Sequence, residues 1–288
     1  MELEQTQKLT TELERIVMTR IEAGRLVVPS MPLIASRCLT LLRDPDFAVH
    51  RLVANLEADA VLAALVLREA NAASHGTAVK ALGQAVTRVG VEALRSIVMK
   101  YAAHELFQSR DRKIAAANKR IWEHSIAVAL LSRELGKRAG CEDPESCYLG
   151  GLLHDVGKPV IASMMLEAER KLATGRAGWI EPSAWVGAVD HAHRRVGTAV
   201  AEHWHLPDEV TAAIRDCAAY DTSEPRAAVN VVRLSNAIAK RSGFAIGTFQ
   251  PAELEAMIMT GSEMLGIPTE AIDEAAAALP ARVQQALG

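Results

Sequence analysis

Apolar residues recur every three or four positions along most of the chain, and this spacing restricts the fold more than any other feature. One example is the segment 3–23, where charged residues separate Leu9, Leu13, Ile16, Val17 and Ile21. A period near 3.6 residues indicates amphipathic helices, whereas half-buried strands alternate with a period of two. Ala and Leu abound, aromatic residues are only 4% of the chain, and β-branched runs are short. We therefore predict an all-α fold.

Turn residues divide this pattern into separate helices. Short helices with breaks at Asp44-Pro45 and Gly90 are expected up to about residue 110, and a long helix is expected over 115–140. Further helices are expected over about 145–156 and in the tail, where Pro280 is expected to break the last one. This pattern predicts two packed helical lobes, the first ending near residue 110 and the second starting near residue 115.

Charge and cysteine content exclude several classes of protein. The net charge is −3 and the isoelectric point about 6.3, without a cluster of Lys and Arg, which argues against a general nucleic-acid-binding protein. No apolar run approaches the roughly 20 residues that span a bilayer. The four cysteines form no CxxC pair and are expected to be scattered, mostly reduced thiols: Cys38, Cys141, Cys147 and Cys217. We expect a cytoplasmic protein.

The stretch 150–158, GGLLHDVGK, places two ionisable residues, His154 and Asp155, inside an apolar run. If the stretch is a helix, the neighbours of His154 on the same face are Gly150, Gly151, Gly157 and Lys158. Glycine inside a helix lowers helix stability by about 1 kcal/mol relative to alanine, so three glycines on one face require an explanation. Two explanations remain open: close approach of another helix, or room for an ion or ligand.

A second histidine, His124, lies 30 residues before His154, and its helical neighbours Ala127, Val128 and Leu131 are apolar. Its imidazole is therefore expected to point inward. Metal sites need imidazole and carboxylate ligands that converge from separate elements. An antiparallel helix pair joined by a short loop would bring His124 to the His-Asp pair.

The order His124, then His154-Asp155, resembles the HD superfamily of metal-dependent phosphohydrolases, whose pattern is His, His-Asp and a distant Asp. Further segments resemble the HDOD domain, the HD-related output domain of bacterial signalling proteins. They are MPLIASRCLTLLRDPD (31–46), LVANLEADAVLAALVLREANAA (52–73), ALGQAVTRVGVEALRSIV (81–98), IWEHSIAVALLSREL (121–135) and HRRVGTAVAEHWHLPDEVTAAI (193–214). The resemblance implies an HDOD-like bundle with an HD-type helical core.

The resemblance also implies domains and site residues. The domains would be an N-terminal helix over 1–25, an HDOD domain over 26–240 with lobes at about 26–110 and 115–240, and a helical extension over 241–288. His124, His154 and Asp155 fall where active HD enzymes have their first three metal ligands. Lys158 falls at a lysine that follows the HD pair in related phosphodiesterases, and His193 at a histidine that HDOD proteins often retain.

Two positions depart from the pattern. Cys217 and Ala218 stand where many relatives have adjacent histidines, and Asn236 stands at the distant Asp. Asn offers a neutral oxygen in place of a carboxylate, which weakens the binding of a divalent cation. We therefore expect no resident cofactor. One weakly held ion is conceivable on His124, His154 and Asp155, with His193 as a further donor.

The resulting prediction is a stand-alone, non-catalytic bacterial signalling module with a degenerate HD site. It would bind a protein partner and conceivably a nucleotide second messenger of cyclic dinucleotide signalling, as a monomer or homodimer, with no membrane and no nucleic acid. The alternative is a metal-dependent phosphohydrolase acting on a nucleotide or cyclic dinucleotide. The ligand pocket of either would contain His124, His154, Asp155, Lys158, His193 and Asn236.

Other polar residues are expected to have ordinary structural roles. A partly exposed turn is the better interpretation of His203 and His205, and a buried small side chain that of Cys217. His191, Arg194 and Arg195 are expected at a solvated face, and Asp216 and Asp221 are weak candidates for ligands.

Overall fold

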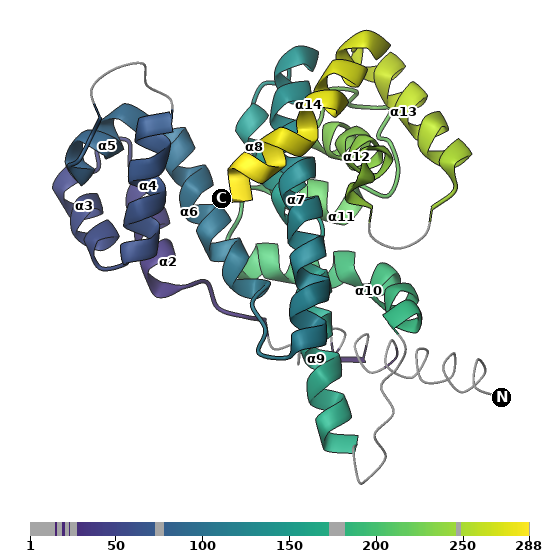
Figure 1. Cartoon of the computed structure of the whole chain (residues 1–288), viewed down its shortest axis with the longest axis horizontal. Coiled ribbons are helices and arrows are strands. Elements are labelled where there is room, and N and C mark those ends of the chain that lie inside the picture. The colour runs from purple at the N-terminus through teal and green to yellow at the C-terminus, as the bar shows by residue number, and fades with distance from the viewer. Residues whose placement is uncertain are drawn as a thin grey trace. The chain divides into compact units, whose positions relative to one another are not determined.

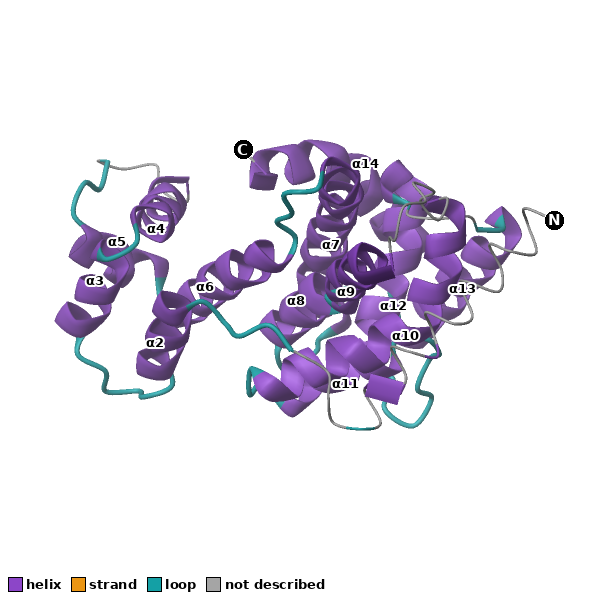
Figure 2. Ribbon diagram, turned by 90° about the horizontal axis from the view of Figure 1, so that it is seen from below, coloured by secondary structure: helices purple, strands orange, loops and turns teal. Residues whose placement is uncertain are grey.

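The computed structural model describes residues 15, 19–20, 23, 28–72, 78–172, 182–245 and 249–287. Within these ranges every regular element is a helix and none is a strand (Figure 2). The all-α prediction is therefore confirmed for this part of the chain. The helix predicted over 1–25 lies almost wholly outside the described residues. None of the helices in the described ranges is long and apolar enough to cross a membrane.

The helices belong to two compact units, one of which is Ser30–Glu105. Its helices are α2 (Leu33–Leu42), α3 (Val49–Glu57), α4 (Ala60–Ala72), α5 (Leu82–Val89) and α6 (Val91–Leu106), whose last residue passes into the other unit. Fully buried leucines such as Leu52, Leu56 and Leu62 form its core. Gly90 separates α5 from α6 with a positive φ of 81°, a conformation that suits glycine.

The second unit holds residues 106–288 together with the first 29. Its helices are α7 (Arg112–Ala139), α8 (Pro144–Leu153), α9 (Gly157–Leu172), α10 (Pro182–His203), α11 (Asp208–Asp216), α12 (Ala228–Ala239), the π-helical turn η1 (Lys240–Phe244), α13 (Pro251–Leu265) and α14 (Thr269–Leu287).

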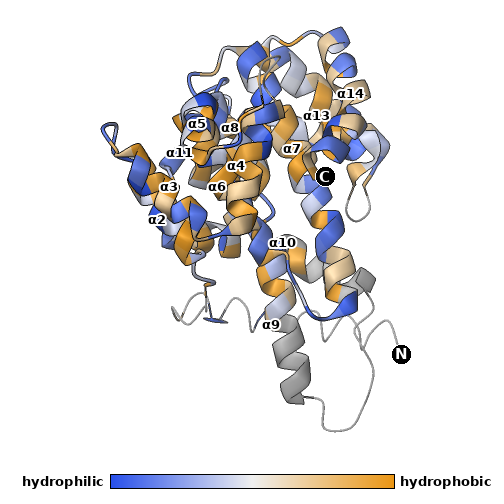
Figure 3. Cartoon of the chain, turned by 60° about the vertical axis from the view of Figure 1, so that its left-hand side comes forward, coloured by the Kyte–Doolittle hydropathy of each residue, from blue (hydrophilic) through white to orange (hydrophobic). Residues whose placement is uncertain are grey.

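The 28-residue helix α7 is the centre of the second unit, and α8, α12 and α14 pack against it (Figure 1). Its inward face carries the fully buried Ile126, Leu131 and Leu135. Hydrophobic and hydrophilic residues alternate along the helices, as in amphipathic helices (Figure 3). Burial of such apolar stripes is the main source of stability in a helical fold.

Two boundaries differ from the sequence prediction. The helix predicted over 145–156 ends at Leu153, so His154, Asp155 and Val156 form a turn before α9. The predicted break at Pro280 was wrong, because α14 runs through it. Proline has no N–H to donate to the carbonyl four residues earlier, but Pro280 is exposed, so that carbonyl can bind water. The buried Leu279 and Val283 hold the helix against the core on both sides of Pro280.

The glycines around the His-Asp pair bring helices close together. A Cβ atom at Gly157 would lie 1.9 Å from the backbone oxygen of His193 on α10, and one at Gly151 would lie 3.0 Å from Cα of Ala129 on α7. A Cβ at Gly150 would lie 2.8 Å from Cβ of Ala213 on α11. Of the two explanations that the sequence left open, close helix approach is the one these contacts support.

We expect Gly157→Ala to lower the free energy of unfolding by about 3 kcal/mol, because the added methyl group would overlap backbone atoms that cannot rotate away. Gly83→Ala is the matched control, since a Cβ there meets no atom within 4 Å. It should be neutral or stabilising by up to about 1 kcal/mol. Urea denaturation followed by circular dichroism measures both. Equal stability of wild type and Gly157→Ala would contradict the close approach of α9 and α10.

Candidate functional site

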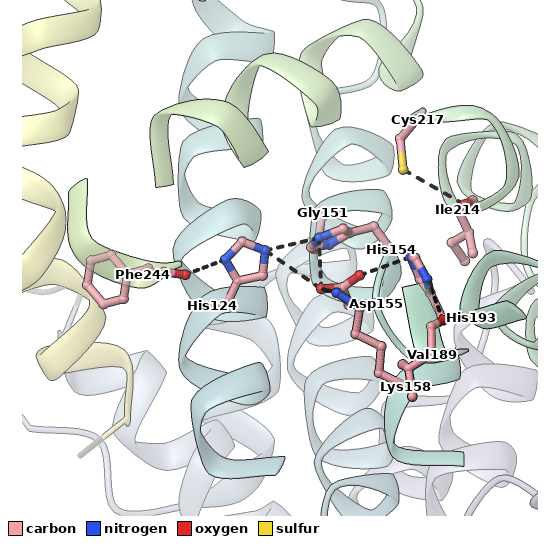
Figure 4. A network of polar contacts seen from close by, with 10 residues as sticks. All are labelled: His124, Gly151, His154, Asp155, Lys158, Val189, His193, Ile214, Cys217 and Phe244. Atoms are coloured by element: carbon pink, nitrogen blue, oxygen red, sulfur yellow. Dashed lines mark hydrogen bonds and ion pairs between the residues drawn. The ribbon is translucent and has the colours of Figure 1, made fainter. Parts of the chain in front are cut away.

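Four ionisable side chains from the second unit lie around the carboxylate of a fifth residue, Asp155 (Figure 4). His124 comes from the middle of α7, His154 and Asp155 from the turn between α8 and α9, Lys158 from the first turn of α9, and His193 from α10. Three segments separated by up to 69 positions in the sequence thus meet at Asp155. The two histidines and the aspartate that the sequence singled out lie side by side.

The carboxylate of Asp155 is the centre of this cluster. Its Oδ2 atom lies 2.8 Å from Nζ of Lys158, 3.5 Å from Nε2 of His154 and 3.7 Å from Nε2 of His124. Its Oδ1 atom lies 3.4 Å from Nε2 of His193. Asp155 and the three histidines are at most 3% exposed. A carboxylate buried to this extent needs paired charge or hydrogen bonds, and Lys158 provides the nearest positive charge.

Backbone carbonyl groups fix the orientation of all three imidazoles. Each histidine places its Nδ1 next to a carbonyl oxygen: His124 at 2.7 Å from Phe244, His154 at 2.7 Å from Gly151, and His193 at 3.0 Å from Val189. A carbonyl oxygen can only accept, so Nδ1 carries the proton in each ring. In a neutral ring, Nε2 then presents a bare lone pair toward Asp155.

The protonation states follow from burial. Desolvation lowers the pKa of His124 to about 3 and also lowers the pKa of His154, so both rings are neutral near pH 7. Burial by itself raises the pKa of Asp155, but the surrounding histidines and Lys158 outweigh it and hold this pKa well below its usual value. Near pH 7 the ionised carboxylate of Asp155 therefore lies beside the neutral imidazoles of His124 and His154.

Two of the bare nitrogen atoms face one another. Nε2 of His124 lies 3.3 Å from Nε2 of His154, and neither has a proton to share in the neutral state. With Oδ2 of Asp155 they form a nearly equilateral triangle of donor atoms. Dividing an edge of about 3.5 Å by √3 puts the centre about 2.0 Å from each corner, which is the length of a zinc–nitrogen or zinc–oxygen bond.

These three residues therefore fit a single divalent ion. Histidine ligands in metalloproteins commonly donate their second N–H to a backbone carbonyl, as His124 and His154 do in this cluster. Against this, the Oδ2 atom that would bind the ion already contacts Lys158. That His124, His154 and Asp155, or in addition His193, act as metal ligands remains a prediction.

Asn236, the position of the distant superfamily aspartate, lies on α12. Its Oδ1 atom is buried and has no hydrogen-bond partner among the described residues. Asn236 precedes Lys240 by one helical turn, and the charge of Lys240 reaches His124 and His154, lowering the pKa of each. No hydrogen bond joins the Oδ1 atom of Asn236 to the cluster, so its membership in the ligand pocket also remains a prediction.

The structure places the remaining candidates apart from the triangle. Cys217 is buried, as expected, and its thiol contacts Arg194. Arg194 is half-buried, so it does not lie at the solvated face that the sequence predicts. The side chain of His191 lies outside the described residues. The remaining weak candidates are exposed at the surface, and they are His203, His205, Asp216 and Asp221.

One component of the site had no signal in the sequence. The carbonyl oxygen of Phe244, 120 positions after His124, fixes the ring of that histidine from the end of η1. Any residue type supplies a backbone carbonyl, so composition and spacing cannot predict this contact. The acceptor of His154 is different, because Gly151 lies only three residues earlier and a helix end commonly leaves its carbonyls available.

Comparisons with known proteins agree with this architecture. A protein from Shewanella amazonensis SB2B, described as a proposed metal-dependent phosphohydrolase, has a crystal structure with a TM-score of 0.73 at 19% identity, covering 95% of this chain and 99% of that one. An HDOD domain protein of unknown function from Geobacter sulfurreducens has a TM-score of 0.62 at 22% identity, covering 94% and 97%. At such identities the likeness shows the fold alone.

Sequence comparison gives the family. An uncharacterized protein from Treponema pallidum (strain Nichols) is 27% identical over 214 residues, which are 73% of this chain and 40% of that protein. This chain thus spans less than half the length of that relative. The family model of the HDOD domain matches residues 28–220, about two thirds of the sequence, and so confirms the resemblance. The chain belongs to the HDOD domain family, a branch of the HD superfamily.

Proposed function

We propose that this chain is a non-catalytic signalling output module that acts by binding a protein partner. The observation that carries this proposal is the burial of the HD cluster: His124, His154 and Asp155 are 1–2% exposed. A hydrolytic metal site keeps one coordination position open for water and substrate. A phosphoester cannot contact donor atoms that the surrounding helices cover.

The charge of the cluster supports the same proposal. Generating hydroxide at neutral pH requires a firmly bound metal ion. Asn236 supplies no negative charge where the superfamily pattern has an aspartate, and Lys158 occupies the same oxygen of Asp155 that an ion would use. The cluster can therefore serve as a buried, charge-balanced junction between α7, α9 and α10.

Exposed apolar residues support the choice of a protein as the partner. Three large apolar side chains on successive helices of the unit Ser30–Glu105 are exposed, namely Leu33 on α2, Val49 on α3 and Val61 on α4. Exposed apolar side chains form protein interfaces where they gather into a patch, and the helices that carry these three pack on one another, α2 with α3 and α3 with α4. A nucleotide second messenger such as a cyclic dinucleotide is a second ligand class. Its phosphate would have to compete with Asp155 for Lys158, whose side chain is 12% exposed.

The rival function is a metal-dependent phosphohydrolase acting on a nucleotide or cyclic dinucleotide. The triangle of bare donor atoms on His124, His154 and Asp155 favours it, because the spacing suits a divalent ion. When bound, such an ion would polarise a phosphoryl oxygen and acidify a water molecule. Activity and metal content therefore distinguish the two functions.

We expect no turnover of cyclic dinucleotides or simple phosphoesters by the purified protein with added Mn²⁺, Mg²⁺ or Zn²⁺. The reason is that the donor atoms are buried and one carboxylate ligand is absent. Wild type is assayed beside His154→Ala and Asn236→Asp, and pull-down with a partner identified in the native cell completes the comparison. Robust wild-type turnover that His154→Ala abolishes would establish the hydrolase. Inactivity of all three, with the partner still captured by His154→Ala, supports the adaptor.

We also expect the purified protein to contain less than one divalent ion per chain and to take up about one during titration with Zn²⁺. His154→Ala should weaken this binding by at least about tenfold, because it removes one of three ligands. His203→Ala is the matched control, since His203 is exposed and lies outside the cluster. Isothermal titration calorimetry and elemental analysis measure both quantities. Two tightly bound ions in wild type would contradict the single, weak site.

A further inference from the structure

Two cysteines that look unrelated in the sequence meet at the junction of α7 and α8. Cys141 follows Gly140, the positive-φ residue after α7, and its backbone N–H donates to the oxygen of Gly136 at 2.9 Å. Cys147 lies in the first turns of α8, and its Sγ atom is 3.1 Å from the position that a Cβ on Gly136 would occupy. Both residues therefore contact one position of α7, and both line the same cleft.

The two thiols have different environments. Cys147 is 1% exposed, whereas Cys141 is half-exposed. The neighbouring thiol of Cys147 lowers the pKa of Cys141, and the charge of Arg226 acts in the same direction, against the effect of burial. The neighbouring thiol of Cys141 and burial raise the pKa of Cys147. Cys141 is thus the accessible nucleophile and Cys147 the neighbouring thiol that can attack an oxidised Cys141.

The cleft restricts which oxidant reaches this pair. It has a volume of about 1090 Å³, and its charged lining residues are Arg226 and five acids, namely Glu142, Asp143, Asp208, Glu209 and Glu224. An excess of carboxylates disfavours anionic oxidants such as glutathione disulfide. Hydrogen peroxide is small and uncharged, so this charge does not hinder its approach.

We propose that Cys141 and Cys147 form a reversible intrachain disulfide with hydrogen peroxide as the oxidant. The sulfur of Cys141 attacks one peroxide oxygen, the O–O bond breaks, and the second oxygen leaves as water with the thiol proton. The sulfur of Cys147 then attacks the sulfenic acid on Cys141, the S–O bond breaks, and the hydroxyl group leaves as water with the proton of Cys147. The two sulfurs lose two electrons, and one peroxide becomes two water molecules.

The disulfide would change one contact that joins this turn to another part of the unit. In the reduced protein the thiol of Cys141 donates to the backbone oxygen of Arg226 at 3.1 Å. A disulfide sulfur has no proton and cannot make that bond. Arg226 lies just before α12, the helix that carries Asn236, so the oxidised and reduced proteins differ where α7, α8 and α12 approach one another.

The first test treats the purified protein with hydrogen peroxide, then denatures it, alkylates free thiols and maps the peptides by mass spectrometry. We expect the peptide containing Cys141 and Cys147 to lose two hydrogen atoms and to escape alkylation until it is reduced. Cys38 and Cys217 should be alkylated in full. In the untreated native protein, Cys141 should react with iodoacetamide at least about tenfold faster than Cys38, whose pKa burial raises to about 11. Free thiols at both positions after peroxide treatment would overturn the proposal.

Two variants separate the proposed roles. Cys147→Ser should leave the sulfenic acid on Cys141 exposed to dimedone, which would label that residue. Cys141→Ser should give neither the disulfide nor the label, and Cys38→Ser is the control that forms the disulfide as wild type does. Absence of dimedone labelling in peroxide-treated Cys147→Ser, or a disulfide that involves Cys38 or Cys217, would overturn the proposal.

Discussion

Asp155 carries a negative charge in the interior of the second unit, and the arrangement of the elements around it satisfies that charge. An unpaired buried carboxylate is far too costly for a protein of ordinary stability. Lys158 provides the counter-charge at 2.8 Å from the following turn of the chain, and three imidazoles enclose the remaining surface of the carboxylate. Because these groups come from α7, the α8–α9 turn, α9 and α10, a single charge links four parts of the unit.

Close backbone packing makes this cluster possible. Gly157 lets α9 approach α10 at the carbonyl of His193, and Gly151 lets α8 approach α7. The carbonyl of Gly151 in turn accepts the Nδ1 proton of His154. Gly151 and Gly157, which as glycines disfavour a helix by about 1 kcal/mol each, therefore set the spacing of the helices around the cluster. A side chain at either position would move the donor atoms apart.

Sequence reasoning succeeded where the determining interactions are local. Helical periodicity and the break expected at Gly90 predict most elements, and the inward-facing position of His124 follows from its apolar helical neighbours. Sequence reasoning failed where a distant part of the backbone determines a helix end or a contact. The end of α8 at Leu153 and the carbonyl of Phe244 depend on elements that spacing does not encode. The pairing of Cys141 with Cys147 likewise requires the α7–α8 turn to be known, since the five intervening residues, 142–146, permit many geometries.

Charge balance relates Asn236 and Lys158 to the binding of a divalent ion at the donor triangle. Without an ion, the side chain of Lys158 balances the carboxylate of Asp155, and the neutral imidazoles of His124 and His154 lie beside this pair. A divalent ion at the donor triangle would add two positive charges to that balanced pair in a site closed to water, and such a charge is expensive to bury. A carboxylate at position 236 would offset part of it, whereas the amide of Asn236 adds only a dipole. If Asn236 belongs to the ligand pocket, as we predict, the missing carboxylate favours a cluster that is stable without an ion over one that depends on it.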